Sequence, residues 1–134
     1  MTGGTVDVVA GIIVRGDRVL AAKRSAAMRW PGYWEFPGGK VEAGETLGQA
    51  LARELEEELS IAIDGFSLWK VKEKKSTEGA IRLFFHLVTG YSGTPAPREG
   101  QELAWLTCEE ARDYPFLPAD KEILSELSTC LQAR

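Results

Sequence analysis

The alternation of hydrophobic and polar residues predicts one amphipathic helix in the middle of a chain that otherwise consists mainly of strands. Leucines recur at every fourth position from Leu47 to Leu59, which places them on one face of a helix. Thr46, followed three residues later by Gln49, has the sequence of a capping box and predicts where this helix begins. We therefore expect a helix from Thr46 to Ile61 with one buried face.

Strand-like segments lie on both sides of this helix. They are rich in β-branched and aromatic residues and are bounded by glycine, proline or polar residues. The segments are residues 5–14, 18–24, 34–37, 66–73, 80–88 and 102–106. Gly16-Asp17 predicts a hairpin turn between the first two segments, Asp64-Gly65 a turn after the helix, and residues 74–79 a polar tip between the fourth and fifth segments.

Two further helices are expected at the end of the chain. Thr107 is placed to cap a short helix over residues 108–113, and Pro118-Ala119-Asp120 opens a last amphipathic helix. The expected buried side of that helix comprises Ile123, Leu124, Leu127 and Leu131. The 134 residues show no internal repeat and no interior linker. We expect a single domain, residues 1–134, with an α/β fold in which a mixed sheet lies between helices.

An acidic cluster lies within the central helix. At about 100° per residue, Glu54 and Glu58 fall at the border of the leucine face, and Glu57 lies about a third of a turn further round. Carboxylates gathered at the edge of a buried face repel one another and lose hydration, so they favour binding of a hard divalent cation. The expected cation is Mg²⁺, and Mn²⁺ can replace it. Arg53 is placed to pair with Glu45. The same residues also suit a solvated acidic helix with ordinary i,i+4 pairs.

The segment before the helix is rich in glycine. Pro37 stiffens its entry, and Gly38-Gly39 permits positive φ angles and a close approach of the backbone. We expect a glycine loop that leads into the acidic helix.

The composition argues against two classes of partner. The formal net charge is −4, whereas proteins that bind nucleic acid usually present a basic face. No apolar run approaches the roughly 18 residues of a membrane span, and the first residues lack the pattern of a signal peptide. We expect a soluble, cytoplasmic protein that binds neither nucleic acid nor membrane. His86 is interpreted as structural, and Arg82 faces either a cleft or water.

The glycine segment and the acidic helix together resemble the signature of the Nudix hydrolases. Gly39, five residues, Glu45, seven residues and then Arg53-Glu54-Leu55-x-Glu57-Glu58-x-x-Ile61 match it at every position but one. The exception is Ser60, where the family has glycine; a left-handed serine there costs about 1 kcal/mol but removes no ligand. The resemblance spans roughly residues 6–131 and implies the α/β/α Nudix sandwich.

The resemblance also implies the metal ligands and the catalytic acids. In the family, the carbonyl just before the signature glycine joins the helix carboxylates on the metal, and a loop acid matching Glu99 supplies a metal contact or the general base. The implied metal ligands are Gly38, Glu54, Glu57, Glu58 and Glu99. The general base stays open among Glu54, Glu57 and Glu99. Arg53 and Glu45 complete the expected catalytic set, and Glu99 also suits a surface loop.

The expected substrate contacts lie on both sides of the glycine segment. Arg24, rather than Lys23, matches the arginine that contacts substrate phosphate in MutT-like members, although both also suit a solvated strand end. Lys40 and Phe36 are further candidates; Phe36, like Trp34, also suits a core position. The implied partner is a nucleotide, and both a monomer and a homodimer fit the sequence.

Asp120 is the expected base-reading residue. MutT-like members place an asparagine there, and an ionised aspartate, which only accepts hydrogen bonds, suits the exocyclic N–H groups of guanine or cytosine. These members also use an arginine that falls near Gly79, where this chain has no cation. Asp120 equally suits a plain N-terminal helix charge, which the helix dipole favours.

The resemblance implies a Mg²⁺-dependent nucleoside triphosphate pyrophosphohydrolase that releases a nucleoside monophosphate and pyrophosphate. Its expected substrate is 8-oxo-dGTP or a related oxidised purine nucleotide, as in MutT-like sanitation of the nucleotide pool. The alternative substrates are CTP, dCTP and 5-methyl-dCTP, because the chain also resembles bacterial CTP pyrophosphohydrolases. A Nudix-fold module that binds nucleotide without hydrolysing it is a further alternative, but the intact helix carboxylates favour an enzyme.

Overall fold

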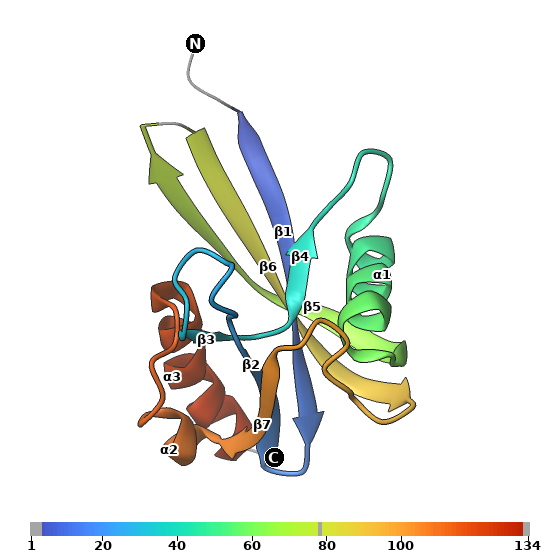
Figure 1. Ribbon diagram of the computed structural model, residues 1–134, viewed down its shortest axis with the longest axis vertical. Helices are drawn as coiled ribbons and strands as arrows, with labels where there is room; N and C mark the ends of the chain where they lie inside the picture. The colour runs from blue at the N-terminus through green and yellow to red at the C-terminus, as the bar shows by residue number, and fades with distance from the viewer. Residues whose placement is uncertain (1–3, 78, 133–134) are drawn as a thin grey trace.

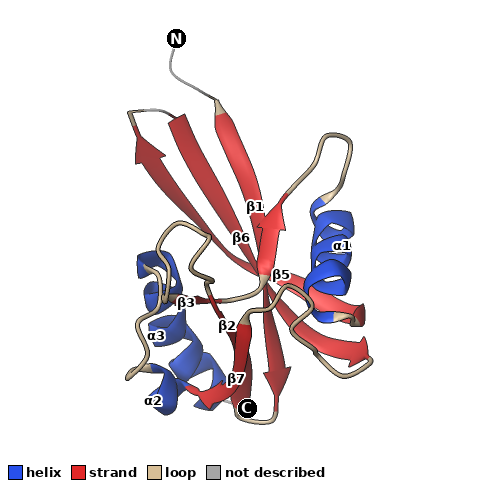
Figure 2. Ribbon diagram, viewed as in Figure 1, coloured by secondary structure: helices blue, strands red, loops and turns tan. Residues whose placement is uncertain are grey.

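The computed structural model describes residues 4–77 and 79–132. In this part of the chain the strands form one seven-stranded sheet in the order β3-β2-β1-β6-β5, with β4 attached to β1 and β7 to β2 (Figures 1 and 2). The strands are β1 (Thr5–Arg15), β2 (Arg18–Lys23), β3 (Trp34–Glu35), β4 (Gly38–Lys40), β5 (Ala62–Ser76), β6 (Gly79–Ser92) and β7 (Glu102–Thr107). The helices are α1 (Leu47–Leu59), α2 (Cys108–Ala111) and α3 (Pro118–Gln132).

The sheet is mixed and lies between helices, which confirms the predicted fold. β1 and β6 are parallel, whereas the other pairs are antiparallel. In Figure 1, α1 lies on one side of the strands and α2 and α3 on the other. Successive β1 residues face opposite sides, so Val9 and Ile13 pack with the leucine face of α1, while Ile12 packs with Ile123 and Leu127 of α3. β1 is therefore the strand on which both cores are built.

The helix boundaries agree with their sequence signals. The Thr46 hydroxyl accepts the Gln49 N–H (3.1 Å) and the Gln49 side chain accepts the Thr46 N–H (2.9 Å), which completes the predicted capping box. Ser60 ends α1 in the left-handed conformation with φ 58°, as the family comparison of that position predicted. Thr107 caps α2. Among the described residues, no helix is long and apolar enough to cross a membrane.

The last helix begins at Pro118, as predicted. Ile123, Leu124 and Leu127 are buried. The side chain of Leu131, the fourth residue of the predicted buried side, lies outside the described part of the structure.

The predicted glycine loop is wrong for its first three residues, which form a strand, whereas residues 41–46 form a loop that leads into α1. Gly38 to Lys40 form β4, which pairs with β1, and neither Gly38 nor Gly39 has a positive φ. The expected close approach is confirmed, because a Cβ atom on Gly38 would overlap the carbonyl oxygen of Val9 on β1. Glycine is needed here for contact with a neighbouring strand and not for a special turn.

The prediction of a turn at Asp64-Gly65 is also wrong. β5 continues through these residues, and its pairing with β6 shifts register between Ile63 and Phe66. A β-bulge inserts an extra residue and bends the strand. Such a site can therefore contain the residues of a turn while the strand pairing continues on both sides. Likewise, β5 runs to Ser76 and β6 begins at Gly79, so most of the predicted polar tip is strand.

Candidate active site

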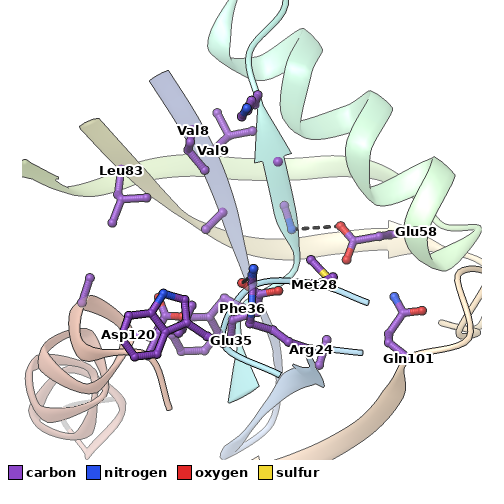
Figure 3. A pocket seen from close by; sticks show the side chains of 18 of the residues that line it. Val8, Val9, Arg24, Met28, Glu35, Phe36, Glu58, Leu83, Gln101 and Asp120 are labelled. Carbon is purple, nitrogen blue, oxygen red and sulfur yellow. Dashed lines mark hydrogen bonds and ion pairs between the residues drawn. The ribbon is translucent and has the colours of Figure 1, made fainter. Parts of the chain in front are cut away.

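A cavity of about 540 Å³ opens beside β1 and β4, and residues from the loop after β2, from β6, from the loop before β7 and from the start of α3 line it. Its two ends differ in chemistry. Glu58 lies at one end, and Leu83 and Asp120 lie at the other (Figure 3). The cavity therefore joins a carboxylate of the acidic helix to a wall in which apolar side chains surround a buried carboxyl.

Glu58 is the buried acid at the charged end. The leucine face of α1 packs on the sheet and carries this residue inward, leaving it only 8% exposed. One carboxylate oxygen accepts the Gly38 N–H at 3.0 Å (Figure 3). Burial raises the pKa of Glu58 to about 8, and the nearby carboxylates of Glu99, Glu35 and Glu54 act in the same direction. Of the three helix acids expected to converge, Glu58 is the one that lies buried at this edge.

Arg53 fixes the segment before α1 against the helix, as predicted. Its Nε and Nη2 donate to the two carboxylate oxygens of Glu45 at 2.7 and 3.0 Å, and Nη2 also reaches the Lys40 carbonyl at 3.1 Å. Nη1 donates to Glu54 at 2.8 Å and to Glu57 at 3.4 Å. The hydrogen bonds from Arg53 hold the pKa of Glu45 at about 2. Arg53 thereby connects β4, the following loop and two acids of the helix.

The donor set fits a hard divalent cation in chemistry and in charge. Its acids supply only oxygen ligands, and Glu54, whose pKa burial raises, also experiences the charges of Glu57 and Glu99. In the described residues no three acidic, histidine or cysteine side chains are already arranged as a metal cage. The reason is visible in the contacts: Glu54 and Glu57 turn toward Arg53, whereas Glu58 turns toward Gly38.

Arg24 is held rigidly beside the cavity. Its Nη1 donates to Glu35 at 2.8 Å and its Nε to the Arg29 carbonyl at 2.6 Å. Glu35, on β3, also lines the cavity, and burial raises its pKa despite the opposing charge of Arg24. Sequence reasoning missed Glu35, because an acid between two aromatic residues of a short strand gives no motif. Lys40 lines the same cavity and is exposed.

Asp120 lines the same cavity from the first turn of α3. It is only 6% exposed, and burial raises its pKa to about 8, with the charge of Glu35 acting in the same direction. Burial therefore favours the neutral carboxyl, which both donates and accepts, over the ionised and purely accepting aspartate expected from the sequence. Asp120 is also not a plain surface charge at a helix end.

Lys74 is a second residue that sequence reasoning missed. It lines the cavity from β5, and its positive charge acts on Asp120. The sequence shows no cation near Gly79, but the pairing of Lys74 with Ile81 across β5 and β6 brings one to this wall of the cavity.

The aromatic residues near the cavity differ greatly in exposure. Phe36 is 3% exposed, and its ring meets those of Phe85 and Phe116 at centroid distances of 6.4 and 5.9 Å, so it is a core residue that only borders the cavity. Trp34 is likewise part of the core. Trp30, which the sequence analysis did not single out, lines the cavity and is 54% exposed.

Two residues singled out from the sequence lie away from the cavity. His86 is buried, its Nδ1 lies 3.1 Å from the Phe84 carbonyl, and burial lowers its pKa. This environment agrees with a structural role. Arg82 pairs with Asp7 at 2.9 Å in an exposed position, which places it toward water.

Comparison with known proteins places this geometry in a family context. The NUDIX domain matches residues 5–127. The chain is 39% identical to the CTP pyrophosphohydrolase of Escherichia coli K12, over 96% of each chain. It is 34% identical to the 8-oxo-dGTP diphosphatase of the same organism, over 91% of this chain and 95% of the relative. The solution structure of the E. coli ORF135 protein is 38% identical and superposes with a TM-score of 0.86, covering 97% of this chain and 93% of that one.

Proposed function

The chain belongs to the NUDIX family of hydrolases, and we propose that it is a Mg²⁺-dependent nucleoside triphosphate pyrophosphohydrolase that sanitises the nucleotide pool. The observation that supports this proposal is one cavity that is lined by Glu58 and Glu99 and also by apolar side chains around Asp120. A triphosphate with its metal suits the two carboxylates, and a nucleobase suits the apolar side chains. The products are a nucleoside monophosphate and pyrophosphate.

The roles of the residues at the charged end follow from their chemistry. The proposed metal ligands are Glu54, Glu57, Glu58, Glu99 and the carbonyl of Gly38. The bound metal would neutralise the phosphates and lower the pKa of the attacking water. Arg24 contacts phosphate from the opposite side, preorganised by its bonds to Glu35 and to the Arg29 carbonyl. Lys40 contacts the phosphates at the rim. Glu54, Glu57 and Glu99 are the three candidates for the general base.

An oxidised guanine nucleotide is the substrate that we favour. In 8-oxoguanine, N7 carries a hydrogen and lies next to the O6 acceptor. A protonated Asp120 matches both groups, since its O–H donates to O6 and its carbonyl oxygen accepts N7–H. Unmodified guanine presents a lone pair at N7, which would face that carbonyl oxygen. The 34% identical relative named 8-oxo-dGTP diphosphatase supports this choice.

Cytidine triphosphates are the second candidate. Cytosine presents the N3 acceptor next to the N4 amino donor, so a protonated Asp120 pairs with it in the same manner. The 39% identical relative named CTP pyrophosphohydrolase supports this alternative.

A panel of substrates tests the proposal. Pyrophosphate release with Mg²⁺ is measured on 8-oxo-dGTP, dGTP, CTP, dCTP, 5-methyl-dCTP and ADP-ribose, and kcat/KM is compared. We expect the highest value for 8-oxo-dGTP; a preference for cytidine nucleotides would select the second candidate. Turnover of none of the triphosphates would contradict both.

A variant of one helix carboxylate separates an enzyme from a binding module. Glu57→Gln should lower turnover by orders of magnitude, whereas a module would bind nucleotide and have no activity to lose. Glu56→Gln is the matched control, because Glu56 is an exposed neighbour on the same helix. Equal activity of the Glu57→Gln variant and the wild-type protein would contradict the proposed role of this acid.

A further inference from the structure

The loop between β2 and β3 carries the two most exposed apolar side chains of the cavity. Trp30 is 54% exposed and Met28 is 45% exposed, yet both line the cavity with the buried residues around it. Single exposed apolar side chains are common on protein surfaces, but neighbouring ones at the wall of a cavity form an apolar surface that a ligand can cover. Here they face a cavity that already contains a polar, buried Asp120.

Trp30 is also held in a strained conformation. Its φ of 56° lies in the left-handed region, which bulky residues rarely adopt and which costs about 1–2 kcal/mol. The loop fixes this conformation: the Trp30 carbonyl accepts the Tyr33 N–H at 3.3 Å, and the Tyr33 ring meets the indole edge to face at 5.6 Å. Strain that a structure maintains at the wall of a cavity indicates that the side-chain position matters.

The same loop is tied to the phosphate end of the cavity. Arg24 Nε donates to the Arg29 carbonyl at 2.6 Å, and the Gly32 N–H donates to the Arg24 carbonyl at 3.0 Å. The backbone of the loop is thus anchored at the residue that we place on the substrate phosphates. A ligand that bridges both ends would contact the two residues together.

Trp30 is the aromatic residue of the cavity whose ring is exposed to a ligand. The other aromatic residues that line it in the described structure are Phe36, which is 3% exposed, and Phe85, which is fully buried. Both rings are engaged with each other in the core. Neither leaves a face free for a flat ligand, whereas the indole of Trp30 does.

We propose that Trp30, flanked by Met28, is the stacking surface for the nucleobase and sets affinity for the base independently of the phosphate contacts. The inference rests on the proposed function, since it names the base subsite of the same cavity. The base lies on the indole, the Met28 thioether packs against its edge, and Asp120 reads its polar edge. Stacking tolerates any base, so Trp30 provides affinity and Asp120 provides selectivity.

Kinetics on three loop variants test the stacking surface. Trp30→Gly removes the ring at a φ that glycine accepts, and should raise KM for the best triphosphate about ten-fold with little change in kcat. Trp30→Phe should restore most of the affinity, and Met28→Ala should raise KM by about two- to three-fold. Leu68→Ala, which shortens an exposed side chain outside the cavity, is the control. An unchanged KM in Trp30→Gly would overturn the proposal.

Inorganic tripolyphosphate distinguishes stacking from an effect through Arg24. It carries the phosphates without a base, so its inhibition constant should be the same for Trp30→Gly and the wild-type protein. An inhibition constant that rises as much as KM would show that the loop acts by orienting Arg24, and would overturn the proposal.

A binding measurement separates this inference from the proposed function. Nucleoside monophosphates should quench the tryptophan fluorescence of the wild-type protein and leave that of Trp30→Phe nearly unchanged, without any hydrolysis. Quenching in a wild-type protein that releases no pyrophosphate would support the stacking surface and contradict the proposed reaction. Turnover without Trp30-dependent quenching would support the reaction and overturn the stacking surface.

Discussion

The burial of the Asp120 carboxyl predicts how the free energy of unfolding changes with pH. Burial and the charge of Glu35 raise its pKa from the ordinary 3.8 to about 8. The unfolded chain ionises this group at pH 7, so keeping it protonated in the folded protein costs on the order of 4 kcal/mol, from about three pH units at about 1.4 kcal/mol each. Asp120→Asn has nearly the same volume, and its amide oxygen can still accept the Phe36 N–H. The variant removes the cost of protonation.

The sign of the effect follows from the raised pKa. The contribution of Asp120 to stability is fully present below pH 3.8 and is lost as pH rises toward about 8. Relative to wild type, Asp120→Asn should therefore gain stability with increasing pH, by about 1.5 kcal/mol at pH 5 and about 4 kcal/mol at pH 7. Glu58 is present in both proteins, so its own titration largely cancels from the difference.

Urea unfolding of the metal-free and nucleotide-free proteins at pH 5 and pH 7 measures this difference. Glu122→Gln, an exposed carboxylate on the same helix, is the control and should change little at either pH. A stabilisation that is equal at the two pH values, or a loss of stability in Asp120→Asn at pH 7, would refute the reasoning that the carboxyl is protonated in the folded state.

Three other predictions concern the acidic helix and the strand beside it. Ser60→Gly should stabilise the protein by about 1 kcal/mol in urea, because glycine adopts the left-handed conformation without strain; no gain would show that the site is already relaxed. Gly38→Ala should cost about 3 kcal/mol of stability because its Cβ overlaps the backbone of β1. Gly39→Ala should instead displace the Glu54 carboxylate, so we expect kcat/KM to fall about 100-fold with a smaller loss of stability. Reversed effects of the two alanine variants would contradict these contacts. Without metal, thermal stability should fall as pH rises from 4.5 to about 8, because the raised pKa of Glu58 makes its stabilising contribution disappear over that range. Addition of Mg²⁺ at pH 8 should restore the stability of the wild-type protein, but should restore that of Glu58→Gln much less.

The local features of the site were predictable because their causes are local in sequence. Thr46 and Gln49 form the capping box that their spacing predicted, and the repeat of leucines determines which side of α1 is buried. The pairing of Arg53 with Glu45 followed from the same helix geometry and is present in the structure. Such features depend on residues within one helix and the loop before it.

The strand β4 was not predictable in this manner. A pair of glycines after proline has the composition of a turn, and only the structure shows that Gly38 lies against the β1 backbone and Gly39 against the Glu54 side chain. The bulge at Asp64-Gly65 has the same cause, since its residues look like a turn until the pairing with β6 is known. Both errors concern the use of glycine, which is decided by what lies opposite it.

The end of the cavity at Asp120 shows why residue identity alone does not determine chemistry. Trp30, Lys74 and Asp120 come from three distant segments, and the parallel pairing of β1 with β6 and the docking of α3 bring them to one cavity. The sequence identified Asp120 but assigned it the charge of an aspartate in water. Desolvation reverses that assignment, because removing a carboxylate from water favours its neutral form. A buried carboxyl therefore favours the form that donates as well as accepts, and the surroundings of Asp120 rather than its identity decide which form predominates.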